Sequence, residues 1–328
     1  MADPMSDLLT VRNLRVEYLT GKGPVCVVDD VSFRIGVGEV YGLAGESGSG
    51  KSTIAQAILR LLRPPAAITN GTISFGGKDI LAMGEEALRA LRWKEISLVT
   101  QSAMNALNPV MRVSEQITDA ITAHERVTAK QALDRAAELF DVVGIDRDRL
   151  SSYPHQLSGG MRQRVVIAIA LALRPKLMIM DEPTTALDVI VQKEILRQLL
   201  GLKEKLGFSL LFITHDLALM LQVCTRIGVL YAGRLMETAP AGILLRTPQH
   251  PYTQGLMSCF LEVHQKKVAR QGIPGAPADL RNPPAGCRFH PRCAFAMDRC
   301  SVEQPLPRSR GEGHESACHL GEGTATTP

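Results

Sequence analysis

The residues best suited to bind phosphate lie at positions 45–53, in the sequence GESGSGKST. Glycines let backbone N–H groups curl around phosphate oxygens, and the Lys51 ammonium can reach the β- and γ-phosphates of a nucleotide. The Ser52 hydroxyl can hold Mg²⁺, and the helical pattern that follows would point its positive end at the same anion. The pattern G-x-x-x-x-G-K-[ST] therefore predicts a phosphate loop made of Gly45, Glu46, Ser47, Gly48, Ser49, Gly50, Lys51, Ser52 and Thr53.

Two acidic residues that could complete this chemistry follow the apolar run at 177–180. Ligands of α/β proteins bind at the carboxyl ends of strands, so Asp181 is placed to bind Mg²⁺, directly or through water. Glu182 could polarise an attacking water as a general base. An acidic pair is common at strand ends, and the phosphate loop upstream is what makes this one informative.

The elements around these residues predict an α/β protein. Alternating apolar and polar residues at 8–18 and 25–35 indicate antiparallel strands, and the short apolar run at 39–45 indicates a buried strand that leads into the loop. Continuous apolar runs at 176–181 and 208–216 are typical of a parallel sheet covered by helices. Helical periodicity at 113–144 predicts a helical insertion over about 102–160.

Composition excludes several classes of protein. The 328 residues carry a net charge of +4, which is too small for the concentrated basic face of a nucleic-acid binder. No run of 18 apolar residues occurs, so we expect no membrane-spanning helix, and residues 1–10 lack the pattern of a secretory signal. The rise in proline and glycine after about residue 240 predicts two parts, 1–240 and a loop-rich extension at 241–328.

Further motifs make the resemblance specific. LSGGMRQR at 157–164 is similar to the signature of ABC transporter ATPases, and DEPTTALD at 181–188 resembles their extended Walker B motif and D-loop. Gln101 resembles the Q-loop glutamine, and His215 the switch histidine. Order and spacing match this family over about residues 8–250. The resemblance implies a phosphate-loop ABC ATPase fold with an antiparallel β subdomain, a RecA-like parallel sheet core and an inserted helical subdomain.

The same resemblance implies roles for further residues. In this family two ATPase domains face head to tail, and ATP lies between the phosphate loop of one and the signature of the other. The implied contacts are Ser158, Gly159 and Gly160 with the γ-phosphate of the partner's ATP. His215 would contact the γ-phosphate and the attacking water, and Gln101 would contact Mg²⁺. Tyr18 would stack on adenine and Asp188 would shape the dimer contact. Taken alone, Ser158 could be a plain helix cap, and His215 or Tyr18 an ordinary structural residue.

A narrower resemblance covers essentially the whole chain. NALNP at 105–109, YPHQLSGGMRQRV at 153–165, HPYTQGL at 250–256 and GCRFHPRCAFAMDRC at 286–300 resemble the ATPase subunits of dipeptide and oligopeptide importers. This implies a second ATPase subunit, which we expect to form a heterodimer with this chain, together with two permease subunits and an extracytoplasmic solute-binding protein. The chain would then sit peripherally on the cytoplasmic face of the inner membrane. Related systems also move nickel, sugars and other small solutes.

Four of the seven cysteines are spaced C-x5-C-x6-C-x17-C, at Cys287, Cys293, Cys300 and Cys318. Four thiolates can hold Zn²⁺ or a [4Fe–4S] cluster, although the C-x2-C pairs of most zinc knuckles are missing. The importer resemblance favours the iron–sulfur cluster over zinc. Unliganded thiols in a small core are the remaining alternative. A site of this kind would hold together an extension too small to fold on hydrophobic burial alone.

Two other functions compete with transport. A soluble ABC-type ATPase of DNA repair or translation would be expected to carry long coiled coils or two ATPase cassettes, and this sequence shows neither pattern. A non-catalytic regulatory partner would be expected to lack Glu182 or His215, and both are present. The sequence therefore predicts an ATPase that energises solute import.

Overall fold

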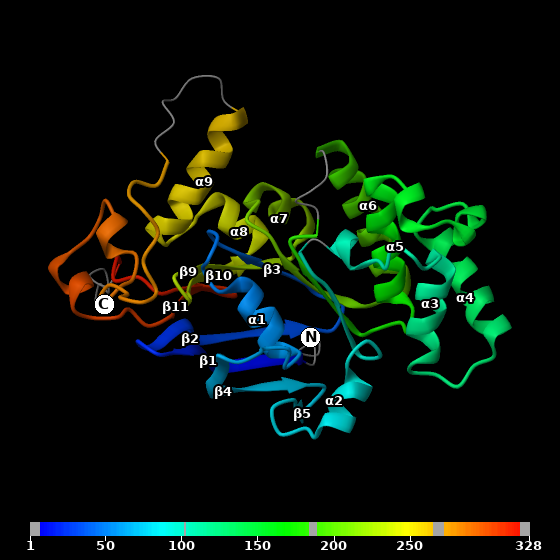
Figure 1. Ribbon diagram of the computed structural model, residues 1–328. Coiled ribbons are helices and arrows are strands. Elements are labelled where there is room, and N and C mark those ends of the chain that lie inside the picture. The colour runs from blue at the N-terminus through cyan, green and yellow to red at the C-terminus, as the bar shows by residue number, and fades with distance from the viewer. Residues whose placement is uncertain (1–6, 102, 184–188, 265–271, 322–328) are drawn as a thin grey trace. The chain divides into compact units, whose positions relative to one another are not determined.

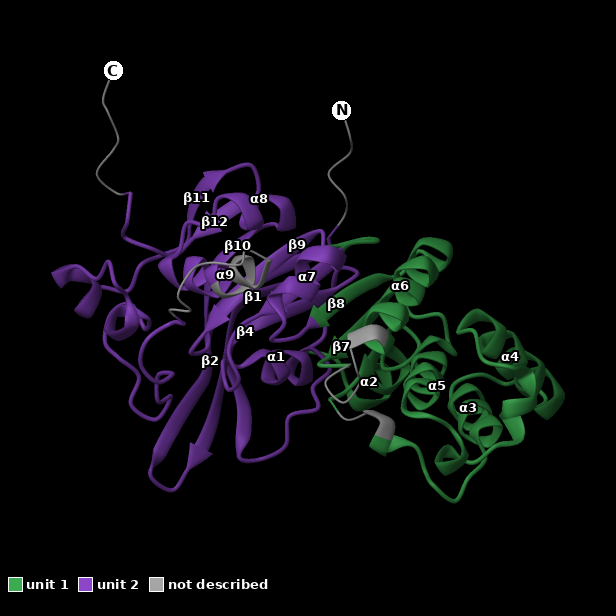
Figure 2. Ribbon diagram, turned by 90° about the horizontal axis from the view of Figure 1, so that it is seen from above, with its two compact units in different colours: residues 1–6, 36–39, 82–212 green, residues 7–35, 40–81, 213–328 purple. Residues whose placement is uncertain are grey.

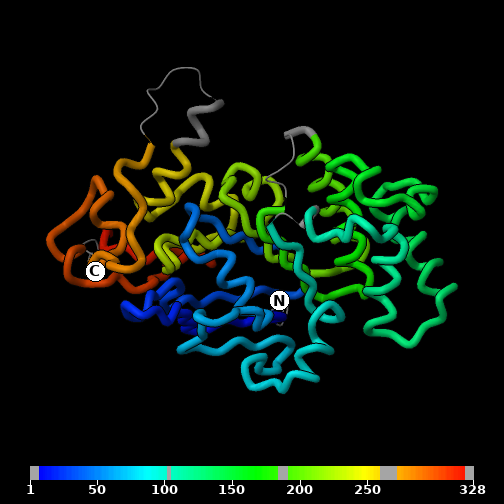
Figure 3. Tube along the Cα trace, in the orientation of Figure 1, coloured from blue at the N-terminus to red at the C-terminus, as the bar shows by residue number. Residues whose placement is uncertain are grey.

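The computed structural model describes residues 7–101, 103–183, 189–264 and 272–321 (Figures 1 and 3). The chain forms two compact units, coloured separately in Figure 2. Unit 1 comprises residues 1–6, 36–39 and 82–212, and unit 2 comprises residues 7–35, 40–81 and 213–328. Among the helices of the described ranges, none is both long enough and apolar enough to cross a bilayer.

Unit 2 contains an antiparallel sheet in the order β2-β1-β4-β5. Its strands are β1 (Asp7–Thr20), β2 (Gly23–Gly36), β4 (Ala66–Phe75) and β5 (Lys78–Asp79). Apolar residues alternate along β1 and β2 and are buried on one face, as the sequence pattern predicts. β1 pairs with β4 from Leu9↔Phe75 to Tyr18↔Ala66, with a register shift near Arg15. This is the predicted antiparallel subdomain.

A second group of strands in unit 2 follows the order β11-β12-β10-β9-β3. β3 (Val40–Ala44) pairs in parallel with β9 (Arg226–Tyr231), which is antiparallel to β10 (Arg234–Pro240). β12 (His314–Ser316) adds to β10, and β11 (Arg308–Gly311) adds to β12. The sequence predicted a loop-rich extension beyond residue 240 and no strand within it, so these two late strands were missed.

The helices of unit 2 are α1 (Lys51–Ile58), α7 (Leu217–Val223), α8 (Ala241–Arg246) and α9 (Pro251–His264). Apolar periodicity predicts that α1 runs to residue 62, but it ends at Ile58. The cause is local, because Arg60 adopts the left-handed conformation, with a φ of 49°.

Unit 1 holds the strands β6 (Ile96–Val99), β7 (Leu177–Asp181) and all but the last residue of β8 (Ser209–Ile213), in the order β8-β7-β6. β6 and β7 are parallel, from Ile96↔Leu177 to Val99↔Met180. Every residue of β7 is buried, as expected for a strand covered on both faces.

The remaining elements of unit 1 are helical. They are α2 (Glu85–Leu91), α3 (Val113–Thr122), α4 (Ala129–Val142), α5 (Gly159–Leu171) and α6 (Val189–Leu206), with short 3-10 turns at Ala103–Ala106, Arg147–Ser151 and Pro154–Gln156. Ile117 and Ile121 of α3 and Ala136 and Phe140 of α4 are buried, because their helical spacing places them on the packed faces. α3 and α4 lie within residues 102–160, where the sequence predicts a helical insertion.

Candidate nucleotide site and cysteine pocket

The phosphate loop of unit 2 joins β3 to α1 in a conformation that requires glycine. Gly45 and Gly50 have φ values of 147° and 103°. A Cβ atom at Gly45 would lie 2.1 Å from the carbonyl oxygen of Leu230, and one at Gly50 would lie 2.7 Å from that of Val27. The backbone therefore passes closer to its neighbours here than any side chain permits.

Lys51 is the first residue of α1, and it is 5% exposed. Its Nζ atom donates hydrogen bonds to the carbonyl oxygens of Gly45 and Glu46, both at 2.8 Å, and to Ser49 Oγ at 3.3 Å. The ammonium group therefore lies within the curl of the loop. Gly50 occupies the N-cap position and, having no side chain, supplies no cap hydrogen bond to the first turn of α1. The N–H groups of a first turn point away from the helix and can bind an anion. This arrangement suits a phosphate group.

Gln101, Asp181 and Glu182 lie in unit 1, where the parallel strands β6 and β7 end. Asp181 is the last residue of β7 and is 6% exposed. Gln101 Nε2 donates a hydrogen bond to Glu182 Oε2 at 3.2 Å. Glu182 has a φ of 46°, a strained conformation for a residue with a side chain. The structure thus brings together a carboxylate and an amide that the sequence predicts to share one site.

The signature residues Ser158, Gly159 and Gly160 form the start of α5 in unit 1. Ser158 Oγ accepts a hydrogen bond from the Met161 N–H at 3.3 Å, so its side chain caps the helix. The Gly159 and Gly160 amides belong to the first turn, where helical N–H groups have no partner within the helix. Capping and anion binding are compatible here, because different groups serve each.

His215 and Tyr18 belong to unit 2, and Asp188 lies outside the described residues. His215 follows β8 and is exposed, and the next residue, Asp216, caps α7 by accepting from the Leu219 N–H at 3.0 Å. Tyr18 is half-buried in β1, opposite Ala66 of β4. The predicted nucleotide residues are therefore divided between the two units.

Cys287, Cys293, Cys300 and Cys318 line one pocket of unit 2, which His290 and His319 also line. Burial and repulsion by the neighbouring cysteines raise the pKa of Cys287 to about 11. Burial likewise raises the pKa of Cys293 and of Cys318. The thiols of Cys287, Cys293 and Cys318 are therefore neutral at pH 7 unless a cation compensates their charge.

Backbone amides point at three of these sulfur atoms. The Leu320 N–H donates to Cys318 Sγ at 3.5 Å, and the amides of Phe289 and Phe295 donate to Cys287 and Cys293. In each case the donor lies two residues after the cysteine. Within the described ranges, however, no three His, Cys, Asp or Glu side chains are grouped as ligands of one metal ion.

Two residues that contact the phosphate loop were not predicted from the sequence. The Glu46 N–H donates to the Tyr252 hydroxyl at 3.1 Å, and Arg292 Nη1 lies 2.8 Å from Glu46 Oε2. Both residues occur in motifs that carry the importer resemblance, HPYTQGL and GCRFHPRCAFAMDRC. The two motifs marked these residues as part of the importer resemblance, but they did not indicate that either residue contacts the phosphate loop.

Sequence comparison places known families on both parts of the chain. Residues 28–185 match the family described as ABC transporter, and residues 236–300 match the oligopeptide/dipeptide transporter C-terminal region. The chain is 44% identical over 321 residues to a dipeptide transport ATP-binding protein, DppD, of Caldanaerobacter subterraneus, covering 97% of this chain and 98% of the relative. It is 42% identical to DppD of Escherichia coli, over 95% and 96% of the two chains.

Comparison with solved structures confirms the fold. The ATP-binding cassette MJ0796, bound to ADP and Pi, is 28% identical, with a TM-score of 0.63 over 71% of this chain and 98% of that chain. CbiO1 from Clostridium perfringens has the same TM-score at 26% identity, over 74% and 96% of the two chains. With the phosphate loop and the near full-length relatives, these matches show that the chain belongs to the ABC transporter ATP-binding proteins, in the dipeptide and oligopeptide transporter group.

Proposed function

We propose that this chain hydrolyses ATP to energise the import of dipeptides or oligopeptides. The observation that carries the proposal is the phosphate loop, where Lys51 is buried against backbone carbonyls and Gly45 and Gly50 allow a close turn. Relatives that align with 97% of the chain are dipeptide transport proteins, which supports the peptide substrate.

In the proposed reaction, the loop amides of residues 45–53 and the Lys51 ammonium stabilise negative charge on the β- and γ-phosphates. Mg²⁺, held by Ser52, Asp181 and Gln101, would neutralise further charge on these oxygens. Glu182 orients the attacking water and accepts its proton. The hydrogen bond from Gln101 supports this role, because it fixes the orientation of the Glu182 carboxylate.

The site is completed by a second ATPase subunit in this proposal. Ser158, Gly159 and Gly160 contact the γ-phosphate bound to the partner's loop, and Asp188 contributes to the dimer contact. The position of Gly159 and Gly160 in the first turn of α5 supports this contact, because helix N-termini bind anions. His215 contacts the γ-phosphate and the attacking water, and Tyr18 stacks on adenine. We propose a heterodimer of two different ATPase chains, as the importer resemblance implies.

The importer assignment brings permease subunits and a substrate-binding protein as partners. We propose that the chain is bound peripherally to two permease subunits at the cytoplasmic face of the inner membrane, and that an extracytoplasmic binding protein delivers the substrate. The two family matches support a division into a nucleotide-binding part, 1–240, and an extension, 241–328, because they fall on residues 28–185 and 236–300.

The extension is proposed to hold a [4Fe–4S] cluster through Cys287, Cys293, Cys300 and Cys318, with zinc as the alternative. Two observations support the fit. All four thiols line one pocket, and three of them accept backbone N–H hydrogen bonds. Such bonds to sulfur are found around bound clusters. The importer resemblance favours the cluster over a single zinc ion, which four thiolates could also hold.

The test is peptide uptake by vesicles that contain the permeases and the second ATPase subunit, with the binding protein added. Wild-type chain should support ATP-dependent uptake, and Lys51→Ala should abolish both uptake and ATP hydrolysis. Lys22→Ala, an exposed lysine in the β1–β2 turn, is the matched control. Hydrolysis that no permease stimulates and that moves no peptide would favour a soluble ABC-type ATPase instead.

A further inference from the structure

We propose that Arg292 and Tyr252 are positioning residues for the phosphate loop, through which the C-terminal extension controls ATP affinity. Both act on Glu46, the second residue of the loop. The inference rests on the proposed ATPase function of that loop. It extends the proposed function by giving a role to two residues outside the nucleotide-binding motifs.

Glu46 is engaged at its amide, its carbonyl and its carboxylate. Its N–H donates to the Tyr252 hydroxyl at 3.1 Å, and its carboxylate Oε2 accepts from Arg292 Nη1 at 2.8 Å. Its carbonyl oxygen accepts from Lys51 Nζ at 2.8 Å. Glu46 therefore links the two C-terminal residues to the lysine that faces phosphate, and fixing it fixes the first turn of the loop.

Arg292 is itself held in place. Its side chain is 7% exposed, Nε donates to the carbonyl oxygen of Pro274 at 2.8 Å, and the guanidinium lies 5.6 Å from the ring centre of Tyr231. A guanidinium fixed by several partners loses little entropy when it binds one more carboxylate. The ion pair is also largely shielded from water, which strengthens it relative to an exposed pair.

Tyr252 is equally constrained. It is fully buried, and its ring packs 4.7 Å from Tyr231 and 5.2 Å from Phe289, measured between ring centres. Burial raises the pKa of Tyr252 well above its usual value, so the hydroxyl stays neutral. Because Phe289 belongs to the cysteine-containing extension, the packing that orients the hydroxyl comes partly from that extension.

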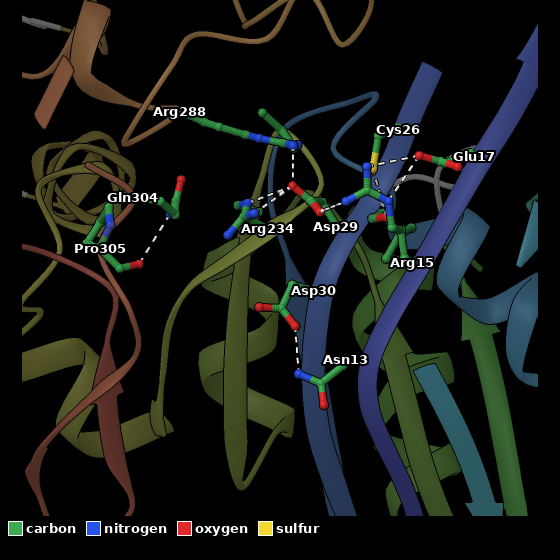
Figure 4. Close-up of polar contacts among 12 residues, drawn as sticks. Asn13, Arg15, Glu17, Cys26, Asp29, Asp30, Arg234, Arg288, Gln304 and Pro305 are labelled. Carbon is green, nitrogen blue, oxygen red and sulfur yellow. Dashed lines mark hydrogen bonds and ion pairs between the residues drawn. The ribbon is translucent and has the colours of Figure 1, made fainter. Parts of the chain in front are cut away.

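The segment 287–293 is anchored at both ends. Near its start, Arg288 forms an ion pair with Asp29 of β2, which also binds Arg15 and Arg234 at 2.8 Å each (Figure 4). Near its end, Arg292 binds Glu46. The cysteines at 287 and 293 bracket this segment, so whatever orders them also sets the position of Arg292.

Charge gives the contact a consequence for ATP. Without Arg292, the Glu46 carboxylate would remain beside the phosphate site as an uncompensated negative charge. It would repel the triphosphate and release the first turn of the loop. A contact that served only to attach the extension would instead change stability and leave nucleotide affinity unaltered.

The experiment measures binding of a fluorescent ATP analogue, together with kcat and KM for ATP, on the full chain with its permeases. Arg292→Met should weaken analogue binding and raise KM roughly tenfold, the effect of losing one charge-assisted hydrogen bond, with a smaller change in kcat. Adding Glu46→Gln should recover most of the loss. Tyr252→Phe, which keeps the ring and removes only the hydroxyl, should weaken binding about threefold. Arg281→Met removes an exposed arginine of the extension and should change nothing.

Wild-type affinity in both Arg292→Met and Tyr252→Phe would overturn the inference, as would a double variant that binds no better than Arg292→Met alone. If Arg292→Met does not fold, the affinities of Tyr252→Phe and Arg292→Lys test the inference instead, because both variants keep most of the packing. Lys51→Ala separates the two levels. If Lys51→Ala loses ATP binding and the Arg292 and Tyr252 variants keep it, only this inference is wrong. If the wild-type chain binds no ATP, the proposed function is wrong.

Discussion

Gln101 and Glu182 are joined by a hydrogen bond of 3.2 Å although they lie 81 positions apart in the sequence. They meet because β6 and β7 are parallel neighbours that end at the same edge of the sheet. The proposed general base is thus oriented by the residue that the family resemblance places in contact with Mg²⁺. Movement of residue 101 would change the orientation of the Glu182 carboxylate.

Glu182→Gln should retain ATP binding and lose hydrolysis. The amide keeps the shape and can still contact Gln101, but it cannot accept a proton from water, which costs on the order of 100-fold or more in kcat. Phosphate release under saturating ATP measures the rate, and analogue binding checks the site. Glu204→Gln, an exposed position of α6, is the control. Hydrolysis at the wild-type rate would exclude Glu182 as the base.

Cys293→Ser should remove the cluster and loosen the extension while residues 1–240 stay folded. Serine is a poor ligand for iron, and the structure of such loop-rich segments depends on their metal. Iron and sulfide analysis on anaerobically purified protein should fall from about four irons per chain, and limited proteolysis should cut within 241–328. Cys26→Ser, whose side chain can still donate to the Val28 carbonyl, should keep its iron. If the analysis instead finds one zinc ion per wild-type chain, the cysteines form a zinc site and the proposed cluster is wrong.

Gly45→Ala should destabilise the chain and abolish ATP binding. The added methyl group would meet the Leu230 carbonyl oxygen at 2.1 Å, so β3 or β9 must shift. We expect a loss of about 2 kcal/mol or more in the free energy of unfolding, measured by urea titration. The matched control is Gly201→Ala in α6, where the methyl group meets no atom within 4 Å. It should stabilise the helix by about 0.5–1 kcal/mol. Equal stability of the two variants would contradict the close packing at Gly45.

We expect the free energy of unfolding to decrease as the pH drops below about 6.5, because of His250. Complete burial lowers its pKa from 6.5 to about 3, so between these values the unfolded chain binds a proton that the folded chain does not. The contribution is fully present above pH 6.5 and is lost at up to about 1.4 kcal/mol per pH unit below it. Urea titrations at pH 7 and pH 5 should show a smaller loss in His250→Asn, whose oxygen can still accept from the Tyr252 N–H. An identical pH dependence in the two proteins would rule out His250 as the group responsible.

The parts of the site that were predicted from sequence are those fixed by local pattern. The phosphate loop needs glycines and a lysine at set spacing, and the strand before it and the helix after it are both present. The family resemblance predicted that Gln101 and Glu182 belong to the same site, but it did not predict the hydrogen bond between them. For Ser158 the structure shows the plainer of the two interpretations, since its hydroxyl caps α5, and the predicted contact with the partner's ATP stays a prediction.

The parts that were missed depend on contacts between distant segments. Glu46 and Arg292 are 246 residues apart, and no periodicity or turn signal connects them. The pairing of β12 with β10 is similar, because three-residue strands in a proline- and glycine-rich region carry almost no pattern of their own. Such strands form because a neighbouring strand supplies hydrogen-bond partners.

That pairing has a consequence for any shortened form of the chain. β12 covers the outer edge of β10, and β11, with Arg308 and Arg310, forms the new edge. Charged, short strands discourage association with other sheets, whereas a bare interior strand invites it. A chain cut after residue 240 would expose the hydrogen-bonding groups of β10. We expect such a fragment to aggregate even with every nucleotide-binding residue of 1–240 intact. β11 and β12 would therefore keep the chain soluble by covering β10.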